Sequence, residues 1–92
     1  MSRVFSGDTA RLYVEFRDFE GVTINPDTVT LTIYNEDESV LKTITNDKII
    51  QHEDAYFYDY THKEPTNYIY EFNGMYKKMP IIARANVSVI FS

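Results

Sequence analysis

The stretch YFYDYTHKEPTNYIYEF, residues 56–72, holds five of the eight tyrosines and two of the six phenylalanines of the chain. Aromatic residues recur at every second position on both sides of the polar segment THKEPTN, which is the period of a β-strand. The stretch therefore predicts two strands joined by a loop. Each strand has one aromatic face, formed by Tyr56, Tyr58 and Tyr60 in the first and by Tyr68, Tyr70 and Phe72 in the second.

The aromatic faces of these two strands have two interpretations. In the first, they are the inward faces of a small β-protein, because tyrosine has a large apolar body and a polar tip that suit a thin core. In the second, flat rings in a row stack on sugars. Period-two placement is the usual signature of a buried face and the chain has no tryptophan, so the core interpretation is favoured. Phe57 and Ile69 on the opposite faces are then left to meet a partner.

The same period of two extends through the rest of the chain. Four further segments alternate in this way: RLYVEFR at 11–17, TVTLTIYN at 28–35, SVLKTIT at 39–45 and IIARANVSVIF at 81–91. With a short strand near residues 3–6, this gives about seven strands spaced roughly 8–12 residues apart, as in β-sandwiches. No long helical pattern could connect parallel strands, and only NDKIIQHED at 46–54 has room for a helical turn. Residues 1–92 are therefore predicted to form one all-β, antiparallel sandwich.

Turn residues separate the predicted strands. DFEG at 18–21 predicts a turn in which Gly21 takes a positive φ. Asn73 and Gly74 form a dipeptide typical of tight hairpins, so we expect a turn there, before the last strand. NEDES at 35–39 is interpreted as a polar hairpin connection. The first and last strands are expected at sheet edges.

The net charge of −5 and the length of 92 residues limit the possible functions. An acidic surface repels phosphates, so neither nucleic acid nor an anionic membrane is an expected partner. No apolar run approaches the roughly 20 residues of a membrane span, and none near the start resembles a signal peptide. The absence of cysteine excludes disulfides and thiolate metal sites. We expect one intact domain made in a cytoplasm.

No group of residues has the pattern of a catalytic, cofactor or metal site. His52 and His62 lie in polar segments without the spacing of a metal or general-base motif, and both are expected at the surface. The acidic segments around Asp18 and Glu36 lack the regular spacing of a calcium loop, so solvated turns are favoured. We expect a protein without metal or cofactor and without catalysis. An enzyme would need two carboxylates that the fold alone brings together.

Two longer segments resemble a known family. GDTARLYVEFRDFEGVTINPDTVTLTIYNED, residues 7–37, is similar to the opening of immunoglobulin-like domains in bacterial surface proteins and tailed-phage structural proteins. PTNYIYEFNGMYKKMPIIARANVSV, residues 65–89, resembles the closing hairpin of that group and places Tyr68 where a tyrosine-corner residue is expected. Glu38 and Ser39 depart from the group, which often has glycine in this connection. The resemblance implies a single immunoglobulin-like sandwich.

The resemblance and the lack of catalytic motifs lead to two expected functions. The first is a non-enzymatic structural protein of a tailed-phage or prophage virion, as a capsid decoration, head–tail completion or tail accessory protein. Its partners would be capsid, connector or tail proteins and copies of the same chain, and it would reside in the virion after assembly in the host cytoplasm. The second is a carbohydrate-binding or host-attachment module with exposed aromatic residues. Residues predicted to bind a partner are Val4, Phe5, Phe57, Ile69, Arg84, Val87, Val89 and Phe91.

Overall fold

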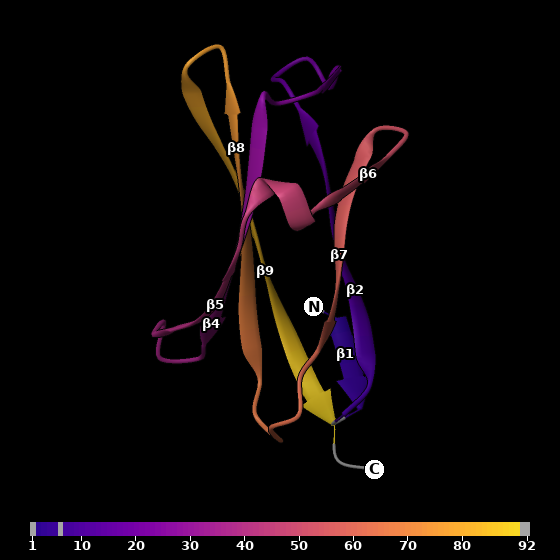
Figure 1. Ribbon diagram of the computed structural model, residues 1–92, viewed down its shortest axis with the longest axis vertical. Coiled ribbons are helices and arrows are strands. Elements are labelled where there is room, and N and C mark those ends of the chain that lie inside the picture. The colour runs from indigo at the N-terminus through magenta and orange to yellow at the C-terminus, as the bar shows by residue number, and fades with distance from the viewer. Residues whose placement is uncertain (1, 6, 91–92) are drawn as a thin grey trace.

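The computed structural model describes residues 2–5 and 7–90, which form nine strands and one short 3-10 helix (Figure 1). The elements are β1 Ser2–Phe5, β2 Thr9–Arg17, β3 Thr23–Ile24, β4 Thr28–Asn35, β5 Val40–Ile44, the helix Asn46–Lys48, β6 Ile50–His52, β7 Ala55–Thr61, β8 Tyr68–Tyr76 and β9 Met79–Ile90. All seven predicted strands are present. The two additional strands, β3 and β6, have only two and three residues, which is too short for a visible period. The short helix lies within residues 46–54, the segment that has room for a helical turn.

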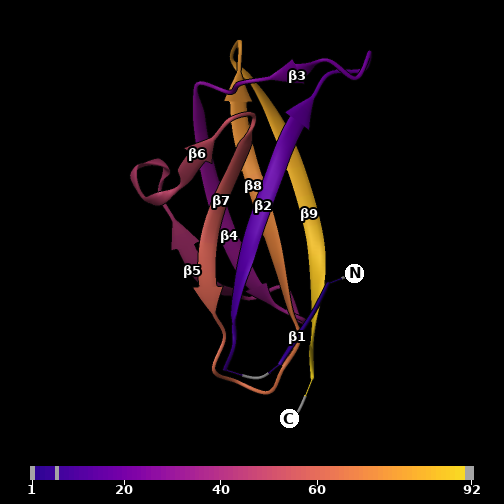
Figure 2. The same cartoon turned by 90° about the vertical axis from the view of Figure 1, so that its right-hand side faces the viewer.

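The strands form two sheets that face each other. One sheet has the order β1-β9-β8-β4-β5 and the other has the order β3-β2-β7-β6. Figure 2 shows β2 and β7 of the four-stranded sheet in front of β4, β8 and β9 of the five-stranded sheet. The predicted all-β sandwich is confirmed, and its strand order is compatible with an immunoglobulin-like arrangement.

The two terminal strands are neighbours in the five-stranded sheet. β1 pairs with β9 in parallel, with Val4 beside Val89, while the other strand pairs are antiparallel. The antiparallel prediction therefore holds except for this pair. The expectation that the terminal strands lie at edges is correct for β1 and wrong for β9, because β1 covers one side of β9 and β8 covers the other.

The core lies between the sheets and contains the inward residues of the alternating strands. Its fully buried members include Leu12 and Phe16 of β2, Leu31 of β4 and Phe72 of β8. The aromatic faces of β7 and β8 point into this core. Tyr56, Tyr68 and Phe72 are buried, and the half-buried residues packed against the core include Tyr58, Tyr60 and Tyr70. The core interpretation of residues 56–72 is confirmed.

Gly74 does not form the predicted turn. It lies inside β8, opposite Val29 on one side and Ile81 on the other. A Cβ atom at this position would lie 2.8 Å from Cγ of Pro26, so glycine is needed because another element approaches closely. The hairpin turn falls instead at Lys77 and Lys78, whose φ angles are 50° and 65°.

The turn at residues 18–21 forms as predicted. Gly21 has a φ of 82°, and its backbone N–H donates to the carbonyl oxygen of Asp18 over 3.0 Å. Oδ1 of Asp18 accepts hydrogen bonds from the backbone N–H groups of Glu20 and Val22, each over 2.9 Å. In the connection between β4 and β5, Glu38 takes a φ of 68°. A non-glycine residue therefore supplies the positive φ that the turn requires there.

Candidate functional site

An apolar row crosses the outer face of the four-stranded sheet. Tyr13 of β2 lies opposite Phe57 of β7, and Phe57 lies opposite Ile50 of β6, so the three side chains form a line across three strands. Tyr13 is 63% exposed and Ile50 is 54% exposed. We call these three residues the apolar row. In Figure 2, the strands that carry it are nearest to the viewer.

An ion pair covers one side of the apolar row. The guanidinium carbon of Arg11 lies 4.0 Å from the centroid of the Phe57 ring, and Phe57 is half-buried. Nε and Nη2 of Arg11 donate to the two carboxylate oxygens of Asp59 over 2.9 and 3.1 Å. This hydrogen bonding raises the pKa of Arg11 and lowers the pKa of Asp59. Asp59 thus holds the cation over the Phe57 ring.

A second ion pair lies on the other side of the row. Nη2 of Arg17 donates to Oε2 of Glu15 over 2.8 Å, and Nη1 donates to the carbonyl oxygen of Gly21 over 3.1 Å. The charges of the two arginines and two carboxylates around the row sum to zero, while the whole chain has a net charge of −5. The apolar row therefore lies in a locally neutral strip of an acidic protein.

A shallow groove of about 350 Å³ follows the row. Its lining combines the row with small and polar residues, namely Arg11, Tyr13, Ile50, Gln51, His52, Ala55 and Phe57. An apolar floor with a polar rim suits contact with another macromolecule's surface, and tyrosine and arginine are the side chains enriched at such contacts.

The outer face of the five-stranded sheet carries a charged network. Arg84 of β9 donates from Nε to Oε2 of Glu71 over 2.9 Å, and from Nη1 to Oε1 of Glu38 over 2.7 Å. Oε1 of Glu71 accepts from Nδ2 of Asn73 over 3.1 Å, and Arg84 lies 5.3 Å from the centroid of the Tyr34 ring. Hydrogen bonds to Glu38 and Glu71 raise the pKa of Arg84. Glu71 is only 9% exposed, so its charge is neutralised within the molecule.

The predicted partner-binding residues fall into different parts of the fold. Phe57 lies in the apolar row, Arg84 in the charged network, and Ile69 half-buried on β8. The structure therefore places Phe57 on the opposite outer face from Arg84 and Ile69, and does not bring these residues into one site.

Val87 and Val89 of β9 are less accessible than predicted. Val87 is 1% exposed and belongs to the core, so its prediction as a docking side chain is wrong. Its period placed it on the inward face of β9, and the pairing of β9 between β1 and β8 buries it. Val89 is half-buried and packs against the core. Val4 and Phe5 belong to edge strand β1, and Phe91 lies outside the described residues.

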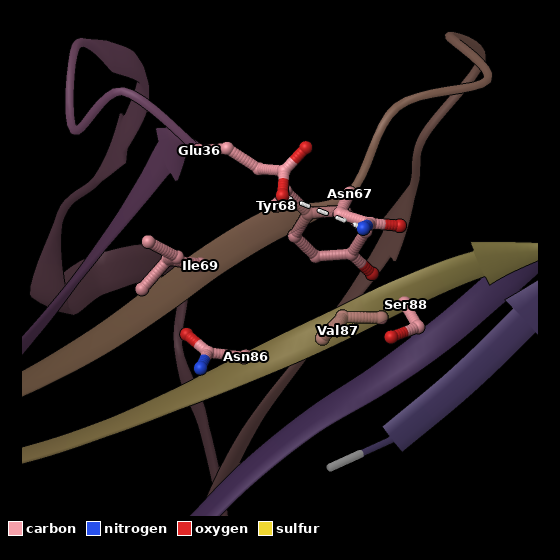
Figure 3. Close-up of a pocket in the computed structure, with 7 residues that line it drawn as sticks. All are labelled: Glu36, Asn67, Tyr68, Ile69, Asn86, Val87 and Ser88. Atoms are coloured by element: carbon pink, nitrogen blue, oxygen red, sulfur yellow. Dashed lines mark hydrogen bonds between the residues drawn. The ribbon is translucent and has the colours of Figure 1, made fainter.

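A smaller pocket, of about 270 Å³, lies at the ends of β8 and β9 (Figure 3). Its lining is formed by Glu36, Asn67, Tyr68, Ile69, Asn86, Val87 and Ser88. Asn67 donates from Nδ2 to Oε2 of Glu36 over 3.5 Å, and its Oδ1 accepts from the backbone N–H of Val89 over 2.8 Å. These bonds hold the connection before β8 against β9 and the β4–β5 turn. The pocket is therefore explained by the way in which these connections close the sandwich.

His62 is buried, which corrects its prediction as a surface histidine. It is 4% exposed, its Nδ1 shares a hydrogen bond of 2.9 Å with the Tyr60 hydroxyl, and its Nε2 shares one of 3.1 Å with Oγ1 of Thr66. The ring centroids of His62 and Tyr68 are 4.6 Å apart. Both ring nitrogens are satisfied by hydroxyl groups, so His62 anchors the loop between β7 and β8.

Tyr68 has the position of a tyrosine-corner residue but lacks its hydrogen bond. It lies at the start of β8 as the resemblance implies, and it is 1% exposed. Among the described residues, however, its hydroxyl has no hydrogen-bond partner, whereas a tyrosine corner bonds back to the backbone. Desolvation raises the pKa of Tyr68 to about 12.

Phe57 was selected from the sequence, but its neighbours Arg11, Tyr13 and Ile50 were not. The alternation of RLYVEFR at 11–17 puts Tyr13 on the face opposite Leu12 and Phe16, so a signal existed. The missing information was the register, which alone aligns Tyr13 with Phe57 and Ile50.

Comparison of the chain with protein-family models, curated proteins and solved structures finds no match. Within residues 2–5 and 7–90, no group of three or more histidine, aspartate or glutamate side chains could hold a metal ion. The same residues contain no helix with the length and hydropathy needed to cross a membrane.

Proposed function

We propose that this protein is a non-enzymatic structural component of a tailed-phage or prophage virion and acts through protein–protein contacts. The observation that supports a docking role is the apolar row on the outer face of the four-stranded sheet. The virion setting rests on the resemblance of residues 7–37 and 65–89 to immunoglobulin-like phage domains. A capsid decoration, head–tail completion or tail accessory protein would each use such a surface.

The apolar row supports docking because its exposure is costly without a partner. Tyr13 and Ile50 each leave more than half of their surface in water, on either side of Phe57 on one sheet face. Contiguous exposed apolar surface on a folded protein marks an interaction site more often than scattered apolar residues do. The neutral strip removes the repulsion that an acidic surface would exert on an acidic partner.

Incorporation into particles tests this proposal. Ile50→Glu places a charge in the apolar row and should abolish incorporation, because an unpaired carboxylate at a buried contact is strongly unfavourable. Ile82→Glu is the matched control, since Ile82 is 60% exposed on β9, outside the row. Mass spectrometry of purified particles measures both variants and the unsubstituted protein. Absence of the unsubstituted protein from particles would reject the virion role, and equal incorporation of both variants would reject docking through the row.

Glycan binding is a second candidate, favoured by one observation. Tyr13 presents an exposed ring on a flat sheet face, and the polar side chains of Arg11, Gln51 and His52 line the same groove. Aromatic rings flanked by hydrogen-bonding groups suit sugar rings. A glycan array followed by titration of tyrosine fluorescence tests this, with Tyr13→Ala expected to abolish any binding and Tyr34→Ala, on the other sheet, to preserve it.

A further inference from the structure

We propose that the apolar row is a two-fold interface between two copies of this chain, with Tyr13 on the symmetry axis. This inference rests on the proposed function of the row as a protein-docking surface, and it names the partner. It follows from the geometry of the row and from the order of charges along β2.

The row has the geometry that a two-fold axis requires. Tyr13, Phe57 and Ile50 are aligned by strand pairing, so they lie along a line perpendicular to the strands. Two sheets can pack face to face, about 10 Å apart, around a two-fold axis in the plane between them. If this axis follows the row, each of the three residues meets the same residue of the second copy, as in an isologous interface. An apolar line would then be buried against itself.

The charges on β2 are complementary under the same symmetry. Arg11 and Glu15 lie two residues before and after Tyr13, each about 7 Å from it along the strand. An axis through Tyr13, perpendicular to β2, reverses the strand direction in the second copy. Arg11 of one copy then faces Glu15 of the other, and Glu15 faces Arg11. One sequence, R-L-Y-V-E, thus supplies two intermolecular ion pairs.

Both charged side chains can bond a second copy without losing their present partners. The hydrogen bonds from Arg11 to Asp59 use Nε and Nη2, and among the described residues Nη1 donates to no carboxylate. Glu15 accepts from Arg17 through Oε2, which leaves Oε1 to accept another donor. The contact would extend each existing pair into a four-membered network of Asp59, Arg11, Glu15 and Arg17.

Net charge favours this face over others for self-association. Two chains of −5 repel each other, and the repulsion is weakest where the facing surfaces are locally neutral. The strip around the apolar row has two arginines and two carboxylates. A second copy is the partner that is guaranteed to have the same strip in the complementary order.

Charge reversal and analytical ultracentrifugation test the interface. The unsubstituted protein should show a monomer–dimer equilibrium between about 1 μM and 1 mM. Arg11→Glu places two glutamates opposite each other in both contacts, and Glu15→Arg places two arginines there. Each variant should weaken dimerisation at least about a hundredfold, because repulsion replaces attraction. A 1:1 mixture of the two variants should form heterodimers, and the double variant should dimerise again.

Controls keep the outcomes distinct. Glu64→Arg reverses a charge in the loop between β7 and β8 and should leave the dimer unchanged; circular dichroism verifies the fold of every variant. A protein that stays monomeric throughout, or a dimer unaffected by the single reversals, would overturn the inference. Failure of the two charge-reversal variants to associate in a 1:1 mixture would also overturn it. The same holds if the protein binds a glycan and remains a monomer. The proposed docking function would be judged separately, by the incorporation of Ile50→Glu and Ile82→Glu into particles.

Discussion

The two outer faces of the sandwich are both exposed to water, but their side chains interact differently. On the five-stranded sheet, Arg84 joins Glu71 and Glu38, and Asn73 occupies the remaining oxygen of Glu71. On the four-stranded sheet, paired charges lie beside the row, while Tyr13 and Ile50 stay more than half exposed. Each face has a central arginine, but one arginine satisfies a nearly buried carboxylate and the other covers a phenylalanine.

This difference indicates which face is complete within the monomer. Glu71 at 9% exposure would be strongly destabilising without Arg84, so the network contributes to the fold itself. Arg11 and Asp59 have side chains 60% and 45% exposed, and pairs of this kind contribute little to stability. The apolar row and its charges therefore have little role in folding, which leaves them free to serve contact with another molecule.

The largest expected effect distinguishes the two arginines. Arg84→Leu should lower the Tm by roughly 10 °C, because Glu71 is left charged, nearly buried and held by Asn73 alone. Arg11→Leu should change the Tm by less than about 3 °C, because its pair with Asp59 is exposed. Thermal unfolding followed by circular dichroism compares the two variants directly.

A third variant identifies the cause of the Arg84 effect. In the double variant Glu71→Leu/Arg84→Leu, no charge is left unpaired between the two positions, and most of the lost Tm should return. Equal Tm losses for Arg84→Leu and Arg11→Leu would show that the two faces contribute alike to folding. Failure of the double variant to recover would assign the loss to packing instead of charge.

The next effect concerns Tyr68, which is buried in the core between the two sheets. Burial raises the pKa of Tyr68 to about 12 from an ordinary value of 10.0. The folded state therefore holds the phenolic proton more tightly than the unfolded state does, and stability falls as pH rises from about 10 to about 12. Tyr68→Phe removes this group and should reduce the slope of stability against pH in that window. Urea unfolding at pH 9, 10 and 11 measures the slope, and an unchanged slope would contradict the assignment to Tyr68.

Alternation along the strands was sufficient to predict six of the seven longer strands, the sandwich and the inward set of tyrosines. Alternation could not predict the pairing of strands. The period shows which residues share a face of a strand, but it does not show which strand lies beside it in the sheet. The parallel contact of β1 with β9 and the alignment of the apolar row both depend on pairing. The inner face was therefore predictable, and the candidate site was predictable only through Phe57.

Two local errors have the same origin. Gly74 has the dipeptide context of a turn, but the approach of Pro26 from another connection determines its role. His62 lies in a polar segment, but Tyr60, Thr66 and Tyr68 from the surrounding elements enclose it. At Gly74, a residue distant along the chain overrides the local preference. At His62, the partners lie within six residues, but the folding of β7, the loop and β8 around the ring buries a residue that polarity alone places at the surface. Short-range sequence signals were reliable where the turn is closed by its own residues, as at Asp18–Gly21.

The smallest expected effect on stability comes from a substitution in the apolar row itself. Tyr13→Thr should change the Tm by less than about 3 °C, because its side chain is 63% exposed and threonine suits a strand surface. The same substitution should clearly reduce the binding of an apolar fluorescent dye, because it removes a large part of the exposed apolar surface. Thr30→Ser on β4 is the control, with neither quantity expected to change. A large loss of Tm for Tyr13→Thr would mean that the row is required for folding, and the contrast between the two faces would then be wrong.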